Sequence, residues 1–450
     1  MLKSVRRSIE GRLSYEKSSH GGKNFGLWIS DCGFRNPQWV AGEARGEEEE
    51  MKITDIKATP VALPMEAPLR HSAAVHPGRC IRTILQVYTD EGIVGVGELE
   101  DVLHDAQLNI LRPLLYGRDP FDLEQLRILI IGTGHLLLQG QNLPRNRLYA
   151  GLEIALMDIQ AKMLGRPLHK LLGGKLRDEI PMSAYLFYRY ESSTHPAVTT
   201  PEEMVGHARD LVARHGFRTL KVKGGVFPPD HEIATMQKLR GAFGPEYQLR
   251  LDPNNVWALG TAIRAGHRLR EVDLEYLEDP TWGIDGMAEV AQRTGIPLAT
   301  NMCVVTFEQI PPAVAKRAVD VILSDPWYWG GPWGVKHLAM ICQTFKIGLG
   351  MHSGLETGVG LAAMLHIAAT LPNLVYAVDA HYHHLTEDLI VGGKMEYRDG
   401  ALRVPDGPGL GVEVDEKRLQ EAARRYELEG GLGFPLDPKR PDWYQKFPMW

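Results

Sequence analysis

Polar residues of chemically capable types recur at the ends of short apolar runs between Leu220 and His384. The spacing from one run to the next is 23 to 29 residues. In order along the chain, these residues are Lys221 and Lys223, Asp252, Glu278, Asn301, Asp325, His352 and His381. One strand, one helix and two loops of a parallel α/β fold consume about this length. Because the carboxyl ends of barrel strands meet at one mouth, the spacing predicts that these side chains converge there.

Three of these residues offer oxygen donors from consecutive predicted strands. They are Asp252, Glu278 and Asn301. Hard oxygen ligands without Cys or His favour Mg²⁺ (or Mn²⁺) over zinc, and they leave coordination positions for water and substrate. One such residue alone is more often a cap or turn residue, but three on consecutive strands favour a metal site.

Two lysines lie on the strand before this metal site. Lys221 and Lys223 alternate with Leu220 and Val222, so both side chains are predicted to project into the barrel. We expect burial and mutual repulsion to lower the pKa of each lysine, which makes a lysine usable as a general base. The alternative, surface lysines on an edge strand, conflicts with the Gly224–Gly225 pair that follows at the mouth.

Asp325 and His352 end the next two predicted strands after Asn301. A lone His is usually structural, but an Asp beside it can fix the tautomer and orientation of the imidazole. We therefore expect the pair to act as an acid/base group across the metal site from the lysines.

Length and composition describe a soluble enzyme with a large core. The chain has 450 residues, of which 44% are hydrophobic, and 50 Lys and Arg stand against 56 Asp and Glu. The net charge of −6 gives no reason to expect a nucleic acid or membrane partner. No apolar stretch approaches the ~18 to 20 residues that span a bilayer. The cysteines are far apart in the sequence, which predicts a reduced, cytoplasmic protein without a disulfide framework.

The patterns divide the chain into four parts. Residues 1–50 lack hydrophobic periodicity and end in consecutive glutamates, so we expect a disordered extension, with a targeting segment as the alternative. Residues 51–180 mix predicted strands and helices, which indicates an α+β capping domain. Residues 181–400 are predicted to form an α/β domain, a modified TIM barrel of the (β/α)7β type. Residues 401–450 are predicted to return to the capping domain.

Two local patterns in the capping domain give specific expectations. Residues 82–100 are interpreted as two strands around a turn at Asp90–Gly92, so the GIVGVG sequence belongs to a hairpin rather than to a nucleotide-binding loop. Residues 150–174 predict an amphipathic helix that ends near Gly165, followed by a short turn at Gly173–Gly174.

Across about residues 51–430 the sequence resembles the enolase superfamily in its mandelate racemase-like branch, and most closely the glucarate dehydratase-related proteins. The motifs that carry the resemblance are YLFY around Tyr185, KVKGG, LDPNNVW, LEDP, ATNMCV, SDPWYW, MHS, VDAH and PGLGVEVD. Asn301 within ATNMCV is the most diagnostic residue, because most relatives carry an acid there. The superfamily uses a Lys or His base with Mg²⁺ that stabilises an ene-diolate.

The resemblance implies a role for each matching residue. The implied metal ligands are Asp252, Glu278 and Asn301. The implied proton-transfer residues are Lys223, tuned by Lys221, on one side and His352 with Asp325 on the other. The residues expected to contact the substrate are His76, Tyr185, Asn254, Ser353 and His381.

The sequence also departs from the glucarate dehydratase pattern. Gly354 and Leu355 stand where paired asparagines are expected, and Phe434–Pro435 stands where an Arg is expected. The loop after Pro280 is short and holds Asp285, another acid that could reach the metal. We therefore expect a distal pocket that does not favour glucarate.

A histidine-rich segment near residue 381 suggests a different metal. His381, His383 and His384 could be read as a zinc site. Alternating strand faces and the lack of a third convergent ligand type argue against this interpretation.

Together these expectations describe a Mg²⁺-dependent hydro-lyase that acts on a small-molecule acid sugar. It abstracts the proton α to a carboxylate and eliminates the β-hydroxyl to give a 2-keto-3-deoxy sugar acid. One alternative is a racemase or epimerase of a 2-hydroxy acid that uses the same two bases. Another is a catalytically silent barrel that only binds a carboxylate. We also expect a homo-oligomer.

Overall fold

The structure is a computed structural model that describes residues 50–100, 105–132, 143–430, 437 and 439–450. The expectation of a disordered extension at residues 1–50 therefore lies outside the described residues, apart from Glu50. The departure at Phe434–Pro435 also lies outside them. Among the described residues, no helix has both the length and the apolar character needed to cross a membrane.

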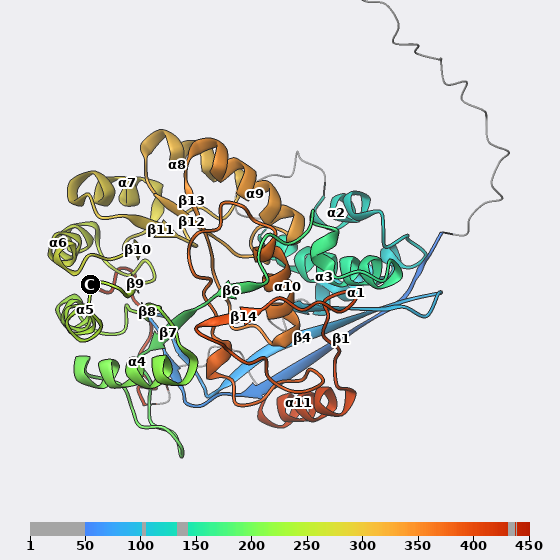
Figure 1. The fold of residues 1–450 in the computed structure, drawn as a ribbon, viewed down its shortest axis with the longest axis horizontal. Coiled ribbons are helices and arrows are strands. Elements are labelled where there is room, and N and C mark those ends of the chain that lie inside the picture. The colour runs from blue at the N-terminus through green and yellow to red at the C-terminus, as the bar shows by residue number, and fades with distance from the viewer. Residues whose placement is uncertain (1–49, 101–104, 133–142, 431–436, 438) are drawn as a thin grey trace, which may run out of the picture. The chain divides into compact units, whose positions relative to one another are not determined.

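A curled parallel sheet occupies the middle of the chain (Figure 1). Its strand order is β13-β12-β11-β10-β9-β8-β7. The strands are β7 (Ser183–Phe187), β8 (Thr219–Lys223), β9 (Gln248–Asp252), β10 (Tyr276–Glu278), β11 (Leu298–Thr300), β12 (Val321–Ser324) and β13 (Gly348–Met351). Residues 374–379 link the two edge strands, since Leu374 bridges Leu349 and Val378 bridges Met182. The predicted modified TIM barrel is confirmed, with its eighth strand reduced to isolated bridges.

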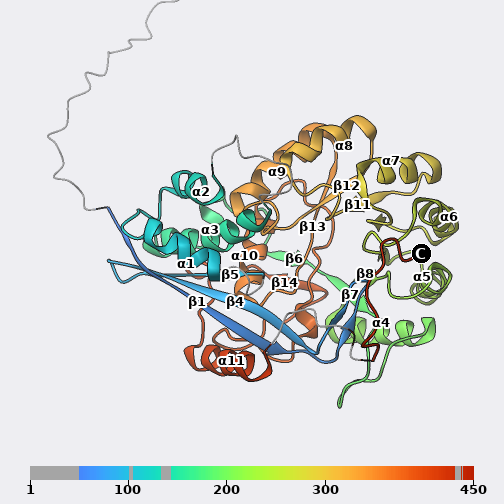
Figure 2. The ribbon, with the colours of Figure 1, turned by 180° about the vertical axis from the view of Figure 1, so that it is seen from behind.

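Helices connect successive strands, and α4 to α9 cover the outer face of the sheet (Figures 1 and 2). They are α4 (Pro201–His215), α5 (Pro229–Phe243), α6 (Leu259–Leu269), α7 (Gly283–Thr294), α8 (Ile310–Lys316), α9 (Pro332–Phe345) and α10 (Gly358–Ala369), with the 3-10 turns η3 (Arg270–Val272), η4 (Phe307–Gln309) and η5 (Tyr382–His384). Local sequence sets their ends. Helix α4, for example, begins with a capping box between Thr200 and Glu203 and ends at Gly216 in the left-handed conformation.

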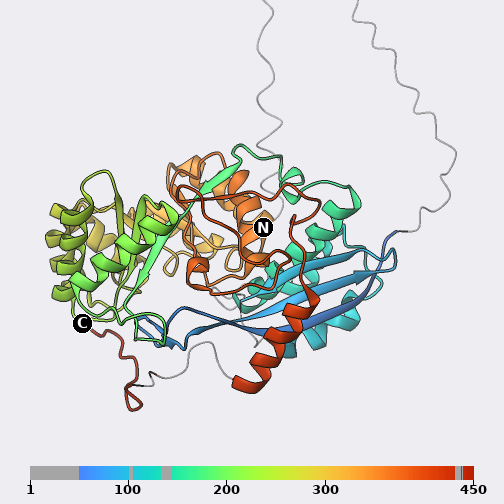
Figure 3. The same ribbon diagram turned by 60° about the horizontal axis from the view of Figure 1, so that its bottom comes forward.

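The capping domain is an antiparallel sheet with helices on both faces (Figure 3). Its elements are β1 (Ile53–Pro64), β2 (Leu69–Arg70), β3 (Val75–His76), β4 (Arg79–Thr89), β5 (Val94–Leu99), α1 (Asp105–Leu115), α2 (Leu123–Ile131), α3 (Leu143–Met163) and η2 (Leu168–Lys170). Strands β4 and β5 pair antiparallel around residues 90–93, so the predicted hairpin is confirmed.

Close packing of α3 on β5 explains the GIVGVG sequence. A Cβ atom on Gly95 would lie 2.1 Å from the carbonyl oxygen of Ala155, and one on Gly97 would lie 2.1 Å from that of Gly151. The glycines therefore let the helix approach the strand. Residues 148–161 of α3 are all buried, so the prediction of an amphipathic helix is wrong. The helix packs against β5 and also against α2 and α9, which leaves residues 148–161 no solvent face.

The C-terminal segment contacts both parts of the fold. Strand β14 (Ala401–Arg403) pairs with β6 (Glu179–Pro181), and α11 (Glu416–Glu429) packs on β1. The last residue returns to the barrel, where the Ala258 N–H donates to the Trp450 carbonyl at 2.6 Å. Glu50–Trp450 form one compact unit, and the domain boundaries inside it stay a prediction.

Candidate active site

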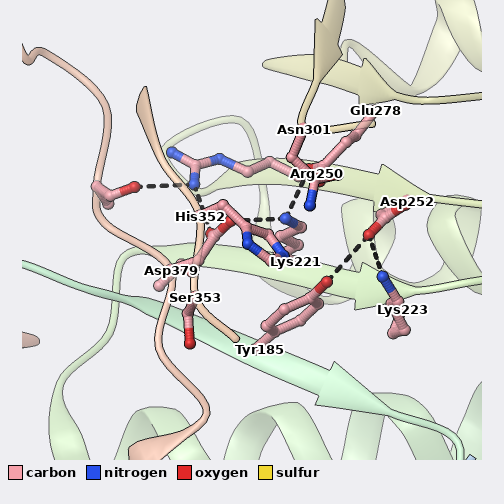
Figure 4. Close-up of polar contacts among 12 residues, drawn as sticks. Tyr185, Lys221, Lys223, Arg250, Asp252, Glu278, Asn301, His352, Ser353 and Asp379 are labelled. Atoms are coloured by element: carbon pink, nitrogen blue, oxygen red, sulfur yellow. Dashed lines mark hydrogen bonds and ion pairs between the residues drawn. The ribbon is translucent and has the colours of Figure 1, made fainter. Parts of the chain in front are cut away.

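The polar residues at the strand ends converge (Figure 4). Asp252 ends β9, Glu278 ends β10 and Asn301 follows β11. All three are buried, with exposed fractions of 0%, 0% and 4%. We name these three residues the strand-end cluster. The parallel register brings them together, as the spacing of the sequence predicts.

Lys223 contacts this cluster from β8. Its Nζ donates to Asp252 Oδ2 at 2.6 Å and to Asn254 Oδ1 at 2.9 Å. The Tyr185 hydroxyl donates to the same Asp252 oxygen at 3.0 Å. Asn254 has a φ of +62°, a left-handed conformation that asparagine tolerates well. These contacts place three of the expected site residues around one carboxylate.

Lys221 lies deeper, and its surroundings differ from expectation. Its Nζ lies 2.6 Å from Glu278 Oε2 and 2.6 Å from Asp379 Oδ2. Burial alone lowers the pKa of Lys221, but the charges of Asp379 and Glu278 outweigh burial and raise the pKa above its usual value. The predicted lowering of the Lys221 pKa is therefore wrong. Lys221 is a fixed positive charge beside Lys223.

Two residues of this network were missing from the sequence prediction. Arg250 donates through Nη1 to Asp379 Oδ1 at 3.1 Å and through Nε to Glu275 Oε2 at 2.6 Å. Arg250 precedes Asp252 by two positions, so strand periodicity could have placed it on the same interior face. Asp379 lies 158 positions from Lys221, and no local signal predicts that pair.

The buried acids have opposing pKa shifts. Burial raises the pKa of Asp252, but Lys223 and Lys221 outweigh burial and lower it. Burial raises the pKa of Glu278 well above its usual range, and the Asp252 carboxylate adds to that rise. The two lysines thus favour the ionised form of Asp252, whereas the ionised form of Glu278 would be favoured by another cation beside it.

The Asn301 amide suggests where such a cation would bind. One terminal atom of the amide lies 3.3 Å from Glu278 Oε1 and 3.0 Å from Asp279 Oδ2, and the other lies 2.9 Å from His352 Nε2. With the amide oxygen on the carboxylate side, three oxygens meet without a proton between them, which is favourable only around a cation. With the amide reversed, its NH₂ group would bond both carboxylates instead. The donor set therefore fits a hard divalent metal.

His352 reaches the cluster from β13. Its Nδ1 lies 2.8 Å from Asp325 Oδ2, and its ring stacks on Tyr328 at a centroid distance of 6.0 Å. A second oxygen of Asp325 accepts from the Trp327 N–H at 2.9 Å, which orients the carboxylate. The structure thus brings the predicted Asp–His pair together beside Asn301.

Ser353 links His381 to a buried carboxylate. The Ser353 hydroxyl donates to Glu356 Oε2 at 2.7 Å and lies 2.8 Å from His381 Nδ1. Because the single hydroxyl proton goes to Glu356, His381 Nδ1 must donate to Ser353. His381 Nε2 is then an acceptor, since burial lowers the pKa of this imidazole well below its usual value.

The capping domain adds residues from the loop around β2 and β3. The His76 ring lies 6.4 Å from that of His381, and burial with the Arg82 and Lys223 charges lowers the pKa of His76 to about 3. His71, which was not predicted, lies 5.0 Å from His76 between ring centroids.

Two other candidate features lie at the edge of the site or outside it. The Asp285 side chain is 82% exposed, forms an ion pair with Lys316 and makes no contact with the strand-end cluster among the described residues.

Gly354 lies against two charged groups. A Cβ atom on Gly354 would lie 3.0 Å from Glu100 Oε1 and 3.3 Å from Arg82 Nη2. An asparagine at position 354 would therefore displace these charged groups.

Comparisons with known proteins agree with this geometry. Residues 53–173 match the sequence model for the N-terminal domain of mandelate racemase / muconate lactonizing enzyme. Residues 203–418 match the model described as enolase C-terminal domain-like. A protein of Streptomyces coelicolor named "Probable glucarate dehydratase" is 41% identical over 411 residues, which cover 85% of this chain and 93% of that protein.

Solved structures show the same fold. An enolase from Mycobacterium smegmatis complexed with tartrate has a TM-score of 0.83 and 41% identity, and the match covers 89% of this chain and 99% of that one. An enolase from Thermobispora bispora complexed with magnesium and formate also has a TM-score of 0.83 and 41% identity, with coverage of 89% and 100%.

Proposed function

The chain belongs to the mandelate racemase / muconate lactonizing enzyme family of the enolase superfamily, and on that premise we propose that it is a Mg²⁺-dependent acid-sugar dehydratase. One observation carries the proposal. Two groups able to transfer a proton contact one set of oxygen donors from different strands, Lys223 through Asp252 and His352 through Asn301. A reaction that removes one proton and delivers another needs this arrangement.

Asp252, Glu278 and Asn301 would hold the metal. The buried carboxylates and the amide oxygen suit Mg²⁺, and Mn²⁺ accepts the same donors. When bound, the ion supplies positive charge that stabilises the charge developing on the substrate carboxylate.

The residues of the chain account for the proton transfers. Lys223 or His352 takes the proton from the carbon next to the carboxylate. The other group donates a proton to the β-hydroxyl, which leaves as water, and the resulting enol tautomerises to a 2-keto-3-deoxy acid. Asp325 holds the His352 ring, and Lys221 keeps a positive charge beside Lys223.

The proposed substrate contacts come from both parts of the fold. His76, Tyr185, Asn254, Ser353 and His381 surround the lysine side of the cluster or connect to it. His381 Nε2 suits a substrate hydroxyl as its donor. The related enolase structure with tartrate supports a substrate that carries a hydroxyl next to a carboxylate.

A racemase or epimerase is the second candidate. It is favoured by the same pair of opposed groups, because such an enzyme removes a proton from one face and returns it from the other. The two reactions differ in the fate of the β-hydroxyl, which only the dehydratase releases.

The test is a panel of aldonic and aldaric acids incubated with Mg²⁺. A dehydratase forms 2-keto acids, EDTA stops the reaction and added Mg²⁺ restores it. A racemase exchanges the α-proton with deuterated water and forms no keto acid. A panel without either reaction, or full turnover after metal removal, contradicts the proposal.

The proposal also includes a cytoplasmic homo-oligomer. The oligomeric state is measured by sedimentation equilibrium across a range of protein concentrations, and a monomer at every concentration contradicts this part.

A further inference from the structure

A second buried group of metal-ligand types lies outside the candidate active site. It consists of Glu66, His207 and His384, and we name it the histidine cluster. Their exposed fractions are 5%, 5% and 0%, and one ligand atom from each lies within 4.8 Å of the others. Glu66 follows β1, His207 lies on α4 and His384 ends η5, so three distant parts of the chain meet here.

The sequence argument against a zinc site in this region depended on assumptions that the structure contradicts. His383 and His384 lie in the 3-10 turn η5, so alternating strand faces do not apply. The missing third type of ligand is supplied by Glu66, which is 318 positions from His384. Alternation of strand faces is therefore the wrong reason, but of the three histidines only His384 belongs to the histidine cluster, and His381 belongs to the candidate active site.

The hydrogen bonds of His384 indicate a cation. Its Nε2 lies 2.8 Å from the Tyr185 carbonyl oxygen, which only accepts, so Nε2 carries the proton. Its Nδ1 lies 2.9 Å from Glu66 Oε1, another acceptor. A neutral ring would direct a lone pair at that carboxylate. Nδ1 must therefore hold a second proton or share a metal ion with Glu66.

His207 distinguishes these two cases. Neither of its ring nitrogens has a hydrogen-bond partner among the described residues, although the side chain is 95% buried or more. Leaving such a group unpaired costs about 1–3 kcal/mol. Its ring stacks with that of His384 at a centroid distance of 6.2 Å and an interplanar angle of 28°. A second proton on His384 leaves both ring nitrogens of His207 unpaired, whereas a shared metal ion binds one of them.

We infer that Glu66, His207 and His384 form a structural site for a transition-metal ion of the Zn²⁺ class. Two imidazoles with one carboxylate favour zinc, cobalt or nickel over Mg²⁺. Zinc bonds to these atoms are about 2.0–2.2 Å long, so small side-chain rotations bring the group to bonding distance. The ion would join the segment after β1 to α4 and η5.

The surroundings of the site supply orientation and access. Arg189 Nη1 donates to Glu66 Oε1 at 2.7 Å, and the Tyr185 carbonyl holds His384 through Nε2, so both ligands are fixed from outside the cluster. His195 Nε2 lies 3.4 Å from Glu66 Oε2, and its side chain is 29% exposed. His195 therefore offers a fourth ligand and a route from solvent.

Two arginines lie near the site. Arg189 pairs with Glu66, and Arg214 pairs with Asp210 at 2.5 Å and lies 4.0 Å from Glu66 Oε2. A divalent ion that replaces the second proton of His384 adds only one charge.

The test measures zinc in the metal-stripped full chain after dialysis against Zn²⁺ with excess Mg²⁺, which blocks the strand-end cluster. We expect one zinc per chain, a rise in Tm of several degrees on zinc addition, and loss of both in His207→Leu. His215→Leu is the matched control, since His215 lies on the same helix outside the histidine cluster, and it should keep both. No zinc above the level of buffer blanks, or equal zinc in the two variants, overturns the inference.

A second measurement needs no variant and covers the case in which His207→Leu does not fold. X-ray absorption at the zinc edge of the loaded wild-type chain should show scattering from imidazole rings. A shell of oxygen atoms alone overturns the inference.

Discussion

The strand-end cluster and the histidine cluster are both buried and both combine acids with basic groups, yet they leave different atoms in need of a cation. In the strand-end cluster, with the Asn301 amide oxygen turned toward Glu278, the atoms without a donor are oxygens of Glu278 and Asn301. In the histidine cluster the surplus atoms are the ring nitrogens of His207. If both proposals hold, the type of unpaired atom, rather than burial or charge alone, selects between a hard metal and a borderline one.

The largest expected effect separates the two clusters by activity. Asp252→Asn should lower kcat/KM by about 10³-fold, because the metal contributes several kcal/mol of transition-state stabilisation. His207→Leu should change kcat/KM by less than about twofold, since the metal proposed there is structural. Steady-state kinetics on the acid-sugar panel measures both. Asp285→Asn is the control at an exposed acid, and a loss there as large as for Asp252→Asn would show that the ligand set is wrong.

A comparable effect should distinguish the two proton-transfer residues of the active site. Lys223→Ala should stop α-proton exchange for one epimer of the substrate and His352→Asn for the other, each by about 10²–10⁴-fold. Deuterium incorporation followed by NMR measures each exchange. If one of these variants dehydrates every epimer at the wild-type rate, that residue is not a base.

Substrate choice depends on the distal pocket, where Gly354 lies against Glu100 and Arg82. A site that lacks hydrogen-bond donors for a second carboxylate no longer favours substrates that carry one. We expect glucarate to fall at least about tenfold below the best aldonate or alternative aldarate in kcat/KM. Glucarate as the best substrate by an order of magnitude would mean that other residues bind its far end.

The histidine cluster should also affect how the free energy of unfolding depends on pH. Burial, followed by the charges of Arg189 and His384, lowers the pKa of His207 well below its usual value of 6.5. The unfolded chain therefore binds a proton below pH 6.5 that the folded chain does not, and stability falls as the pH falls. In the metal-stripped protein the contribution of this one group to the slope approaches about 1.4 kcal/mol per pH unit below pH 6.5. Urea unfolding between pH 5 and 7 should show a shallower slope for His207→Leu, and identical slopes would refute the neutral buried imidazole.

The smallest expected effect concerns the first 50 residues. A chain that begins at Met51 should keep its Tm and its activity, because this segment lacks apolar periodicity and ends in a run of glutamates. Differential scanning calorimetry and the kinetic panel measure both quantities. A large drop in either would show that the segment packs on the body of the protein or on a second copy.

Much of the barrel could be predicted because its signals are local and repeated. The residues that end β8 to β13 follow apolar runs at regular spacing, and the hairpin around Asp90 carries its own turn signal. The burial of α3 on all sides could not be predicted from local signals, because the α2 and α9 helices that cover it come from other parts of the chain. The direction of the Lys221 pKa shift was likewise predicted wrongly, since Asp379 was not known to be its neighbour.

The sequence by itself determined the barrel, the oxygen donors at its strand ends and the positions of Lys223 and His352, because a parallel register turns regular spacing into convergence. Only the tertiary structure decided which charges face each other across the interior and that Glu66 meets His207 and His384. The physical reason is that many of these contacts join residues more than about a hundred positions apart, where no periodicity acts. Packing alone sets which polar atoms are buried there and which of them find a partner.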